Sequence, residues 1–473
     1  MLNTSPDFKE NSRRAMQDAG LQKALDRARK PFAQTRAAAV ARLPEFETLR
    51  ETAKGIKNHT LAHLDFYLER YAEQVEAHGG QVHWCRTAED ARNAVLDICR
   101  RVGAKTVTKG KSMISEEIGL NEHLAENGVR PVETDLGEYI LQIRGEAPSH
   151  IIGPAFHLNR EDWEASFRAA HTHLPADRVF HEKRDIQAEA RAVLREQFIA
   201  ADVGITGANF LIAETGSSVI VTNEGNGDLT QTLPRVHIVL ASLEKIVPTL
   251  EDTVSLLRVL ARSATGQEFS VYTTFSTGAK RPGDPDGPEE YHVILLDNGR
   301  SNMVGTEFQD MLRCIRCSAC MNHCPVYLTV GGHAYGSMYS GPMGSVLTPA
   351  IFGADQAHLL PTASTFCGKC ESVCPMKIPL TGMMRHWRER AFERHLAPAT
   401  TRYGIRGWGF VARRPGLYRS VSRLAAWGLG IMGRKRGRFG WLPLAGAWTA
   451  ARDMPAPEGE TFFARYAREQ RSR

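Results

Sequence analysis

The first 80 residues are rich in Ala, Arg, Glu and Leu, and their apolar positions recur at the spacing of a helix. Leu61, Leu64, Leu68 and Tyr71 follow one another at intervals of three or four residues. Such spacing places apolar side chains on one face of a helix. Residues 1–80 are therefore predicted to form two or three helices that pack on the domain that follows.

From residue 81 the pattern changes to short apolar runs separated by amphipathic stretches. Strands are predicted at Gln81–Cys85, Thr106–Thr108, Arg130–Glu133, Val219–Thr222, His237–Leu240, Phe269–Thr274 and His292–Leu296. A helix is predicted to begin at Thr87, where Asp90 completes a capping box, and another to cover Thr253–Ala264. Alternating strands and helices are typical of a mostly parallel sheet covered by helices. Residues 81–300 are accordingly predicted to be an α/β domain.

The chain has 473 residues, of which 42% are hydrophobic and 24% charged, enough for several globular domains. Its first 30 residues mix charges and lack the apolar segment of a signal peptide. No apolar run approaches the roughly 20 residues that span a bilayer. We therefore expect a cytoplasmic protein without a transmembrane segment.

Positive charge is concentrated at the C-terminal end. Residues 401–473 contain fifteen Lys or Arg and four Asp or Glu, whereas the whole chain has a net charge of only +6. The body of the protein is therefore slightly acidic, which argues against nucleic-acid binding. Trp408, Trp427 and Trp441 are interleaved with these basic residues. We expect residues 396–473 to form a basic extension that docks on an acidic partner subunit. A solvated appendage, peripheral contact with an anionic membrane and binding of this tail to nucleic acid are the alternatives.

Two runs of cysteines carry the clearest chemical signal. The first, Cys314 to Pro325, has the spacing C-x2-C-x2-C-x3-C-P of bacterial ferredoxins. The second, Cys367 to Pro375, repeats only its last three cysteines. Thiolates are soft ligands that suit iron–sulfur clusters. Residues 301–395 are therefore predicted to be an α-helical, ferredoxin-like module with two clusters.

In ferredoxin spacing, three cysteines of a run hold one cluster and the fourth reaches the other. This crossing assigns Cys314, Cys317, Cys320 and Cys374 to cluster 1, and Cys324, Cys367 and Cys370 to cluster 2. Aligning the two runs places Ser364 at the position of the missing cysteine. Three alternatives remain for cluster 2: a [3Fe–4S] cluster, a cubane with an oxygen ligand such as Ser364, or a cubane with an open iron. We predict two [4Fe–4S] clusters, the second with three cysteine ligands.

A structural zinc module and disulfides are the competing interpretations of these cysteines. Pairs of the form C-x2-C also bind zinc, but seven cysteines and two Cys-Pro endings fit zinc poorly. Disulfides are disfavoured in a long chain without a secretion signal. Cys85 and Cys99 lie apart from the two runs and are predicted to be buried packing residues.

Two loops at the ends of predicted strands are candidate ligand sites. Loops at the carboxyl ends of parallel strands commonly bind ligands, and hydroxyl, amide and lysine groups suit an anion. The candidate residues are Lys109, Ser112 and Glu116 in one loop, and Glu214, Thr215, Gly216 and Ser217 in the other. Neither loop has a dinucleotide-binding fingerprint, and simple connecting turns are the alternative.

Three stretches together resemble the LutB (YkgF) family, the iron–sulfur subunits of a three-protein L-lactate utilisation system. They are Val107–Asn121, Asp202–Ser218 and the two cysteine runs up to Leu380, followed by the Trp/Arg-rich end. The resemblance implies that residues 81–300 form a lactate-utilisation domain of the sugar-isomerase/CoA-transferase-like α/β class. It also implies two partners, a cysteine-rich redox subunit and a second protein with a lactate-utilisation domain. A three-cysteine second run is normal for that family.

The combined prediction is an electron-transfer subunit of a complex that oxidises L-lactate to pyruvate and passes single electrons through two clusters. A small hydroxy acid is a possible ligand of the α/β domain. One alternative is the iron–sulfur subunit of a glycolate- or glycerol-phosphate-type dehydrogenase. Another is a non-catalytic redox sensor or scaffold. Fold-level likeness does not identify catalytic residues, so none is assigned.

Overall fold

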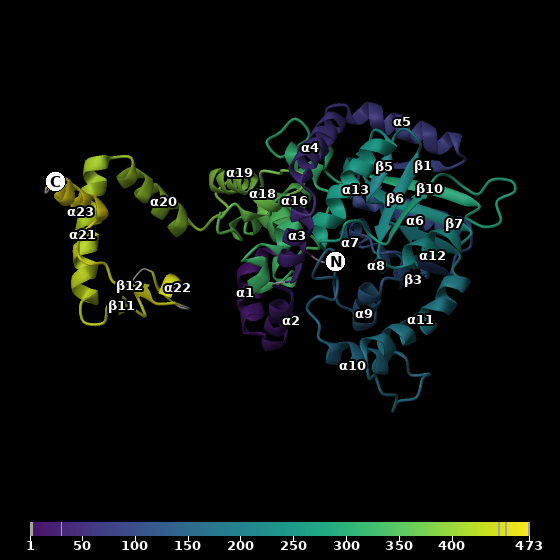
Figure 1. The fold of residues 1–473 in the computed structure, drawn as a ribbon, viewed down its shortest axis with the longest axis horizontal. Coiled ribbons are helices and arrows are strands. Elements are labelled where there is room, and N and C mark those ends of the chain that lie inside the picture. Colours follow the sequence, from purple (N-terminus) through teal and green to yellow (C-terminus); the bar gives the residue numbers. More distant parts are fainter. Residues whose placement is uncertain (1–2, 30, 443–444, 450–451, 472–473) are drawn as a thin grey trace. The chain divides into compact units, whose positions relative to one another are not determined.

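The structure is a computed structural model that describes residues 3–29, 31–442, 445–449 and 452–471. The chain divides into two compact units, Met1–Ala391 and Phe392–Arg473. The first unit contains the α/β domain and both cysteine runs, and the second contains the basic extension (Figure 1).

A six-stranded parallel sheet forms the centre of the first unit. Its order is β1-β10-β7-β4-β2-β3. The strands are β1 (Gln81–Cys85), β10 (Glu290–Leu296), β7 (Val236–Ser242), β4 (Val203–Thr206), β2 (Thr106–Lys109) and β3 (Arg130–Glu133). Every residue of β4 and β7 is buried, as expected for strands covered on both faces. The predicted parallel α/β fold is confirmed, although β4 was not predicted.

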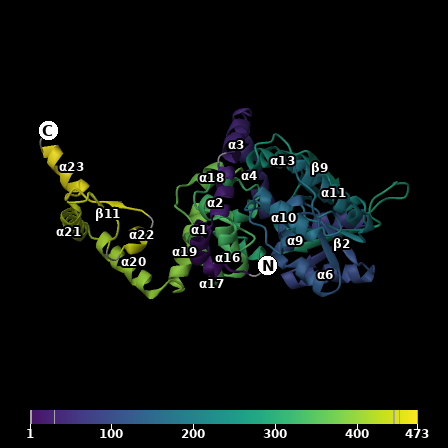
Figure 2. The same cartoon turned by 90° about the horizontal axis from the view of Figure 1, so that it is seen from below.

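Helices of the domain lie on both sides of this sheet (Figures 1 and 2). They are α6 (Ala88–Arg101), α7 (Met113–Ile118), α8 (Leu120–Glu126), α9 (Leu136–Arg144), α10 (Arg160–Ala170), α11 (Lys183–Ala200), α12 (Asn226–Thr232) and α13 (Leu250–Ala264). The capping box predicted for α6 is present, with the Asp90 amide donating to Thr87 Oγ1 at 3.2 Å. Helix α6 buries Val95 and Leu96 in the main core.

A second sheet of four strands, which was not predicted, has the order β8-β5-β6-β9. Its strands are β5 (Phe210–Ile212), β6 (Ser217–Thr222), β8 (Ile246–Val247) and β9 (Tyr272–Ser276). Strands β5 and β6 form an antiparallel pair. Strands β5 and β8 are parallel. Residues 214–217 therefore follow a strand with one parallel and one antiparallel neighbour, and they form the hairpin turn to β6. The pairing of short, distant strands is not visible in local hydrophobic patterns.

The described residues of the N-terminal segment form five α-helices, where two or three were predicted. They are α1 (Phe8–Gln17), α2 (Ala19–Arg29), α3 (Pro31–Ala41), α4 (Phe46–Ala62) and α5 (Leu64–Ala77), preceded by the 3-10 turn η1 (Ser5–Asp7). Helices α4 and α5 pack on the α/β domain, as expected. Helices α1 and α2 instead pack on the cysteine-containing module, as Figures 1 and 2 show. The rings of Phe8 and Tyr335, for example, are 5.3 Å apart.

The cysteine-containing module is built from short helices. They are η3 (Ser301–Met303), η4 (Gln309–Arg313), α14 (Ala319–Asn322), α15 (Tyr327–Val330), η5 (His333–Tyr335), α16 (Gly341–Phe352), α17 (Ala354–Ala357), η6 (Leu360–Thr362), α18 (Lys369–Val373) and α19 (Leu380–Glu393). Two arginines of the N-terminal helices hold the end of α18. Arg36 donates to the Val373 carbonyl at 2.9 Å, and Arg50 donates to the Cys374 carbonyl at 2.7 Å.

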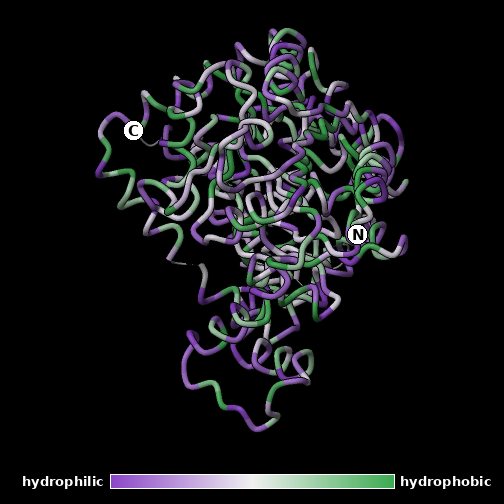
Figure 3. The backbone as a smooth tube through the Cα atoms, turned by 90° about the vertical axis from the view of Figure 1, so that its right-hand side faces the viewer, coloured by the Kyte–Doolittle hydropathy of each residue, from purple (hydrophilic) through white to green (hydrophobic). Residues whose placement is uncertain are grey.

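The second unit is mainly helical. Its elements are α20 (Ala399–Ala412), α21 (Pro415–Gly433), β11 (Arg438–Phe439), α22 (Gly446–Thr449), β12 (Met454–Pro455) and α23 (Phe462–Arg471). Trp408 and Trp427 are 59% and 57% exposed, and hydrophilic and hydrophobic positions are mixed along the helical segments of the chain (Figure 3). Within the described part of the chain, no helix combines the length and apolar character needed to cross a membrane.

Gly332 marks a close approach between the cysteine module and the α/β domain. A Cβ atom at this position would lie 1.7 Å from the Ser149 carbonyl oxygen. By contrast, a Cβ at Gly382, an exposed position of α19, would meet nothing within 4 Å. The backbone of the α/β domain at Ser149 thus occupies the space that a side chain at position 332 would need.

We expect Gly332→Ala to lower the melting temperature, because overpacking costs about 1–3 kcal/mol or more. The matched variant Gly382→Ala should raise it slightly, since Ala is favoured over Gly in a helix by roughly 0.5–1 kcal/mol. Calorimetry of both purified variants measures the difference. An unchanged melting temperature for Gly332→Ala would contradict the close packing.

Candidate functional site

The seven cysteines of the two runs lie together in one module. Cys314 follows η4, Cys320 lies on α14, and Cys370 lies on α18. One small cavity is lined by Cys314, Cys317, Cys320 and Cys374. The structure therefore brings the last cysteine of the second run to the first three cysteines of the first run.

The thiols fall into two groups when the residues that shift their pKa values are compared. Burial raises the pKa of Cys320 well above its usual range, and the nearby Cys314, Cys317 and Cys374 raise it further. Burial raises the pKa of Cys370 to about 12, with smaller contributions from Glu371, Cys324 and Cys367. Several thiolates can be buried together only where a cationic centre compensates their charge. The two groups of thiols fit metal-cluster binding.

Backbone amides are directed at these sulfur atoms. The Ala319 amide donates to Cys317 and the Lys369 amide donates to Cys367. The remaining pairs are Val326 and Tyr327 with Cys324, and Met376 and Ile378 with Cys374. Hydrogen bonds to cluster sulfurs help to set the reduction potential. The chain thus supplies the surroundings that an iron–sulfur cluster requires.

The spacing of the sulfur atoms distinguishes a cluster from a single zinc ion. Two sulfurs bound to zinc at about 2.3 Å each lie within about 4.6 Å of one another. Throughout the described residues, no three cysteines bring their sulfurs within 4.8 Å of one another. In this structure, therefore, no three described cysteines have the sulfur spacing of a shared zinc ion.

The two cysteine runs share an unusual backbone conformation. Arg316 and Ser318 flank Cys317 with φ angles of 60° each, and Phe366 and Gly368 flank Cys367 with φ angles of 53° and 74°. Positive φ is uncommon outside glycine, so its repetition supports the alignment of the runs. This alignment places Ser364 at the position of Cys314, and the Ser364 hydroxyl accepts the Phe366 amide at 3.1 Å.

A cavity of about 300 Å³ opens at the carboxyl ends of β2 and β4. Its lining includes Gly110, Lys111, Ser112, Gly207, Asn209, Asn223, Glu224, Lys245, Arg316, Cys317 and Tyr339. Asn223 and Glu224 are exposed, whereas Lys245 and Cys317 are buried. The cavity therefore leads from the protein surface to the first cysteine run. Ser112, a predicted ligand residue, lies in its wall.

A buried network of charges connects the cavity to the α/β domain. Arg300 donates to both carboxylate oxygens of Glu117, at 2.9 and 2.6 Å, and lies 3.0 Å from Glu244. Glu244 also accepts Arg316 Nη2 at 2.9 Å, and Tyr339 donates to Glu117 at 2.5 Å. Arg316, between the first two cysteines, is thereby held in place by residues of the α/β domain.

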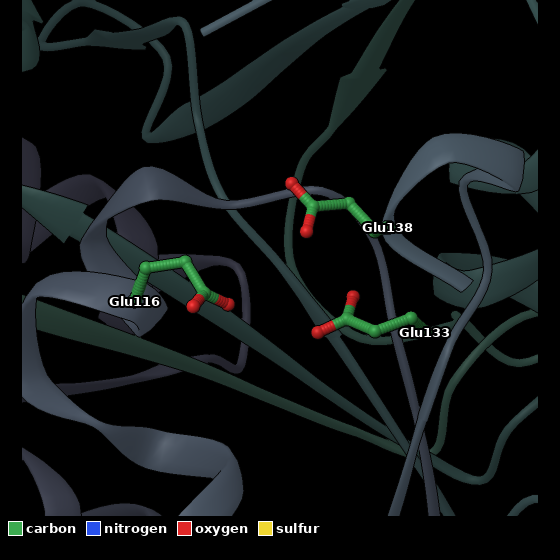
Figure 4. Close-up of side chains that lie close together, drawn as sticks. All are labelled: Glu116, Glu133 and Glu138. Carbon is green, nitrogen blue, oxygen red and sulfur yellow. The ribbon is translucent and has the colours of Figure 1, made fainter. Parts of the chain in front are cut away.

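Lys109, predicted as a ligand residue, is instead part of a buried charge cluster. The carboxylates of Glu116, Glu133 and Glu138 lie within 4.8 Å of one another and face a common centre (Figure 4). The Lys109 ammonium lies 2.7 Å from Glu133 and 3.2 Å from Glu116. Burial alone would lower the pKa of Lys109, but these carboxylates raise it above its usual value. Burial and the neighbouring Glu133 raise the pKa of Glu138 well above its usual range. Lys109 and Glu116 thus have structural partners.

The second predicted ligand loop lies away from the cavity. Gly216 has a φ of 68° and approaches the backbone of Gln74 on α5. Glu214 accepts the Leu250 amide at 3.1 Å, and the Ser217 and Thr277 hydroxyls are 2.5 Å apart. None of Glu214, Thr215, Gly216 and Ser217 is among the residues that line the cavity. The structure therefore does not bring the two predicted loops to one site. Sequence reasoning missed Lys245, which lies in no motif, and Arg316, which lies within the first cysteine run but not at a cysteine position.

Models of three families match successive parts of the chain. The LUD domain matches residues 68–296, and a 4Fe-4S dicluster domain matches residues 310–378. The C-terminal domain of lactate utilisation protein B matches residues 391–471.

Curated relatives match over nearly the whole length. The lactate utilization protein B of Bacillus licheniformis is 42% identical over 96% of this chain and 95% of its own. That of Bacillus subtilis is also 42% identical, with the same coverage. The chain belongs to the lactate utilization protein B family. Another member, from a Geobacillus species, is 44% identical over 90% of this chain and 89% of its own. The resemblance of the sequence to this family is thereby confirmed.

One solved structure is also similar, a DUF162 family protein from Deinococcus radiodurans. It is 15% identical and covers 49% of this chain and 98% of its own, with a TM-score of 0.26. That score is too low to support a structural argument.

We expect Cys374→Ser to lose as much iron as Cys317→Ser, because both thiols line the same cavity. Cys324→Ser and Cys367→Ser should instead affect the other cluster. Iron and sulfide analysis with electron paramagnetic resonance (EPR) after anaerobic purification measures both effects. The control Cys99→Ser, in the core of the α/β domain, should retain all iron. If Cys374→Ser removed the same signal as Cys367→Ser, the crossed assignment would be wrong.

Proposed function

We propose that this chain is the electron-transfer subunit of a complex that oxidises L-lactate to pyruvate. Membership of the lactate utilization protein B family and the match to a 4Fe-4S dicluster domain support an iron–sulfur subunit. The observation that carries the proposal further is the cavity of the α/β domain, whose inner wall includes Cys317. A small molecule bound there lies beside the thiols assigned to cluster 1.

The two groups of cysteines suit the electron count of the reaction. Oxidation of L-lactate to pyruvate releases two electrons and two protons. A [4Fe–4S] cluster, when bound, supplies a one-electron carrier, so two clusters accommodate one substrate molecule. Cys370 contributes to the pKa of Cys320, which indicates that the two groups are close neighbours. We propose [4Fe–4S] clusters at both sites, with Ser364 in the position of the fourth ligand of cluster 2.

The exposed thiol of the module lies in the second group, which suggests a direction of electron flow. In the first group Cys314 is half-buried and the other three thiols are buried, whereas in the second group Cys324 and Cys370 are buried and Cys367 is exposed. The first group adjoins the cavity and the second reaches the surface. In our proposal, the first group of thiols would hold the one-electron carrier beside the cavity, and the second group would hold the carrier that faces a partner subunit.

The partners proposed are a cysteine-rich redox subunit and a second protein with a lactate-utilisation domain. The unit Phe392–Arg473 offers a docking surface, because Trp408 and Trp427 are exposed on a strongly basic segment. Exposed Trp and Arg side chains are common anchors of protein interfaces. An acidic surface on a partner would complement it.

The test is substrate-dependent reduction in the reconstituted complex. With all three subunits present under anaerobic conditions, L-lactate should bleach the visible absorbance of the clusters, and Cys317→Ser should abolish this reduction. D-lactate, glycolate and glycerol 3-phosphate serve as competing substrates. If glycolate or glycerol 3-phosphate bleached the clusters and L-lactate did not, that compound would be the substrate instead of L-lactate. Clusters that dithionite reduces but no hydroxy acid reduces would favour a sensor or scaffold.

A further inference from the structure

We propose that the cavity of this chain binds the carboxylate of a small hydroxy acid through Lys245 and Arg316, beside Cys317. This inference rests on the proposed function and deepens it by placing the organic ligand in this subunit. It is carried by two buried cationic groups that have unused hydrogen-bonding capacity and line the same cavity.

Lys245 is the first of these groups. It ends η2 (Leu243–Lys245), and only 8% of its surface is exposed. Within the described part of the chain its ammonium group takes part in no hydrogen bond or ion pair, and only longer-range attraction from Glu244 and Cys314 favours its charge. Burial of a charge is costly unless the charge is paired. Burial, followed by the nearby Arg316, lowers the pKa of Lys245 to about 8. An anion in the cavity would supply the missing partner.

Arg316 is the second group, and its orientation is fixed. Its Nη2 atom pairs with Glu244 at 2.9 Å, and its guanidinium lies 5.2 Å from the centre of the Tyr339 ring. Its Nη1 atom is buried and has no hydrogen-bond partner within the described part of the chain. A planar guanidinium is well suited to a carboxylate. One side of Arg316 is thus anchored, and the other is available.

The other charged groups of the cavity do not compete for this role. Lys111 donates to the Ile152 carbonyl at 2.9 Å and lies 3.5 Å from Asp135, so its charge is already compensated. Glu224 is exposed at the outer end. The inner end therefore favours an anion, and Ile220, Leu240 and Leu260 supply apolar walls. A volume of about 300 Å³ is at the small end of the range of ligand sites.

The experiment measures binding to the isolated, cluster-loaded chain rather than turnover. Pyruvate is the probe, because it carries the carboxylate but does not donate electrons as lactate does. Lactamide, which lacks the negative charge, is the control ligand. Calorimetry should show that pyruvate binds and lactamide does not. Lys245→Met should weaken pyruvate binding by roughly 10- to 100-fold, the value of a charged hydrogen bond. Lys105→Met, at an exposed position outside the cavity, should leave binding unchanged.

A second measurement does not depend on any variant. Pyruvate labelled with ¹³C at the carboxylate should show hyperfine coupling to the EPR signal of reduced cluster 1. Absence of pyruvate binding, equal binding by Lys245→Met at normal iron content, or absence of this coupling would each overturn the inference. Reduction of the complex by L-lactate without pyruvate binding here would leave the proposed function intact and place the substrate in a partner. Pyruvate binding without reduction by L-lactate would overturn the proposed function alone.

Discussion

The buried chain of charges Glu117–Arg300–Glu244–Arg316 determines how the two halves of the first unit meet. Glu117 and Glu244 belong to the α/β domain, and Arg316 belongs to the loop between Cys314 and Cys317. Burial would raise the pKa of Glu244, but Arg300 and Arg316 lower it to about 2, so this carboxylate stays ionised at neutral pH. Removing one member of a buried ion pair typically costs about 3–5 kcal/mol. The network therefore fixes the first cysteine loop against the cavity.

Fixed geometry matters at this position because the loop has two roles. Its backbone, with positive φ at Arg316 and Ser318, directs Cys314 and Cys317 toward one centre. Its Arg316 side chain points away to Glu244 and lines the ligand cavity. A shift of the loop would change the thiol geometry and the cavity wall together. The charge network thus holds the first cysteine loop and the proposed ligand site in a fixed relation.

Much of the fold could be predicted because its signals are local. Five of the six strands in the parallel sheet were predicted, since each contains apolar residues and lies next to turn residues. The cysteine module could be predicted from the spacing of its cysteines, and the start of α6 from the capping residues Thr87 and Asp90. Strand β4 was missed because its four residues, Val203–Thr206, adjoin a glycine-containing loop. The second sheet and the burial of α1 and α2 on the cysteine module depend on distant partners, which hydrophobic spacing does not specify.

The candidate site was harder to predict for the same reason. The loop containing Lys109 has the composition of an anion site, but Glu133 of β3 compensates the charge of Lys109. Sequence alone does not show which lysine of a chain lacks a carboxylate. Lys245 lies in a turn without a motif, and its importance becomes visible only when the distant Arg316 is brought to the same cavity.

The packing of α1 and α2 on the cysteine module has a consequence for biosynthesis. The ribosome completes these helices first, yet their partners α15 and η5 emerge only after the entire α/β domain. The hydrogen bonds from Arg36 and Arg50 to the carbonyl groups of Val373 and Cys374 likewise form only after those later residues have been synthesised. Domains generally fold as units during synthesis, so the α/β domain can form before the cysteine module is complete. The thiols therefore reach their final burial only when the earliest and the latest segments of this unit pack together.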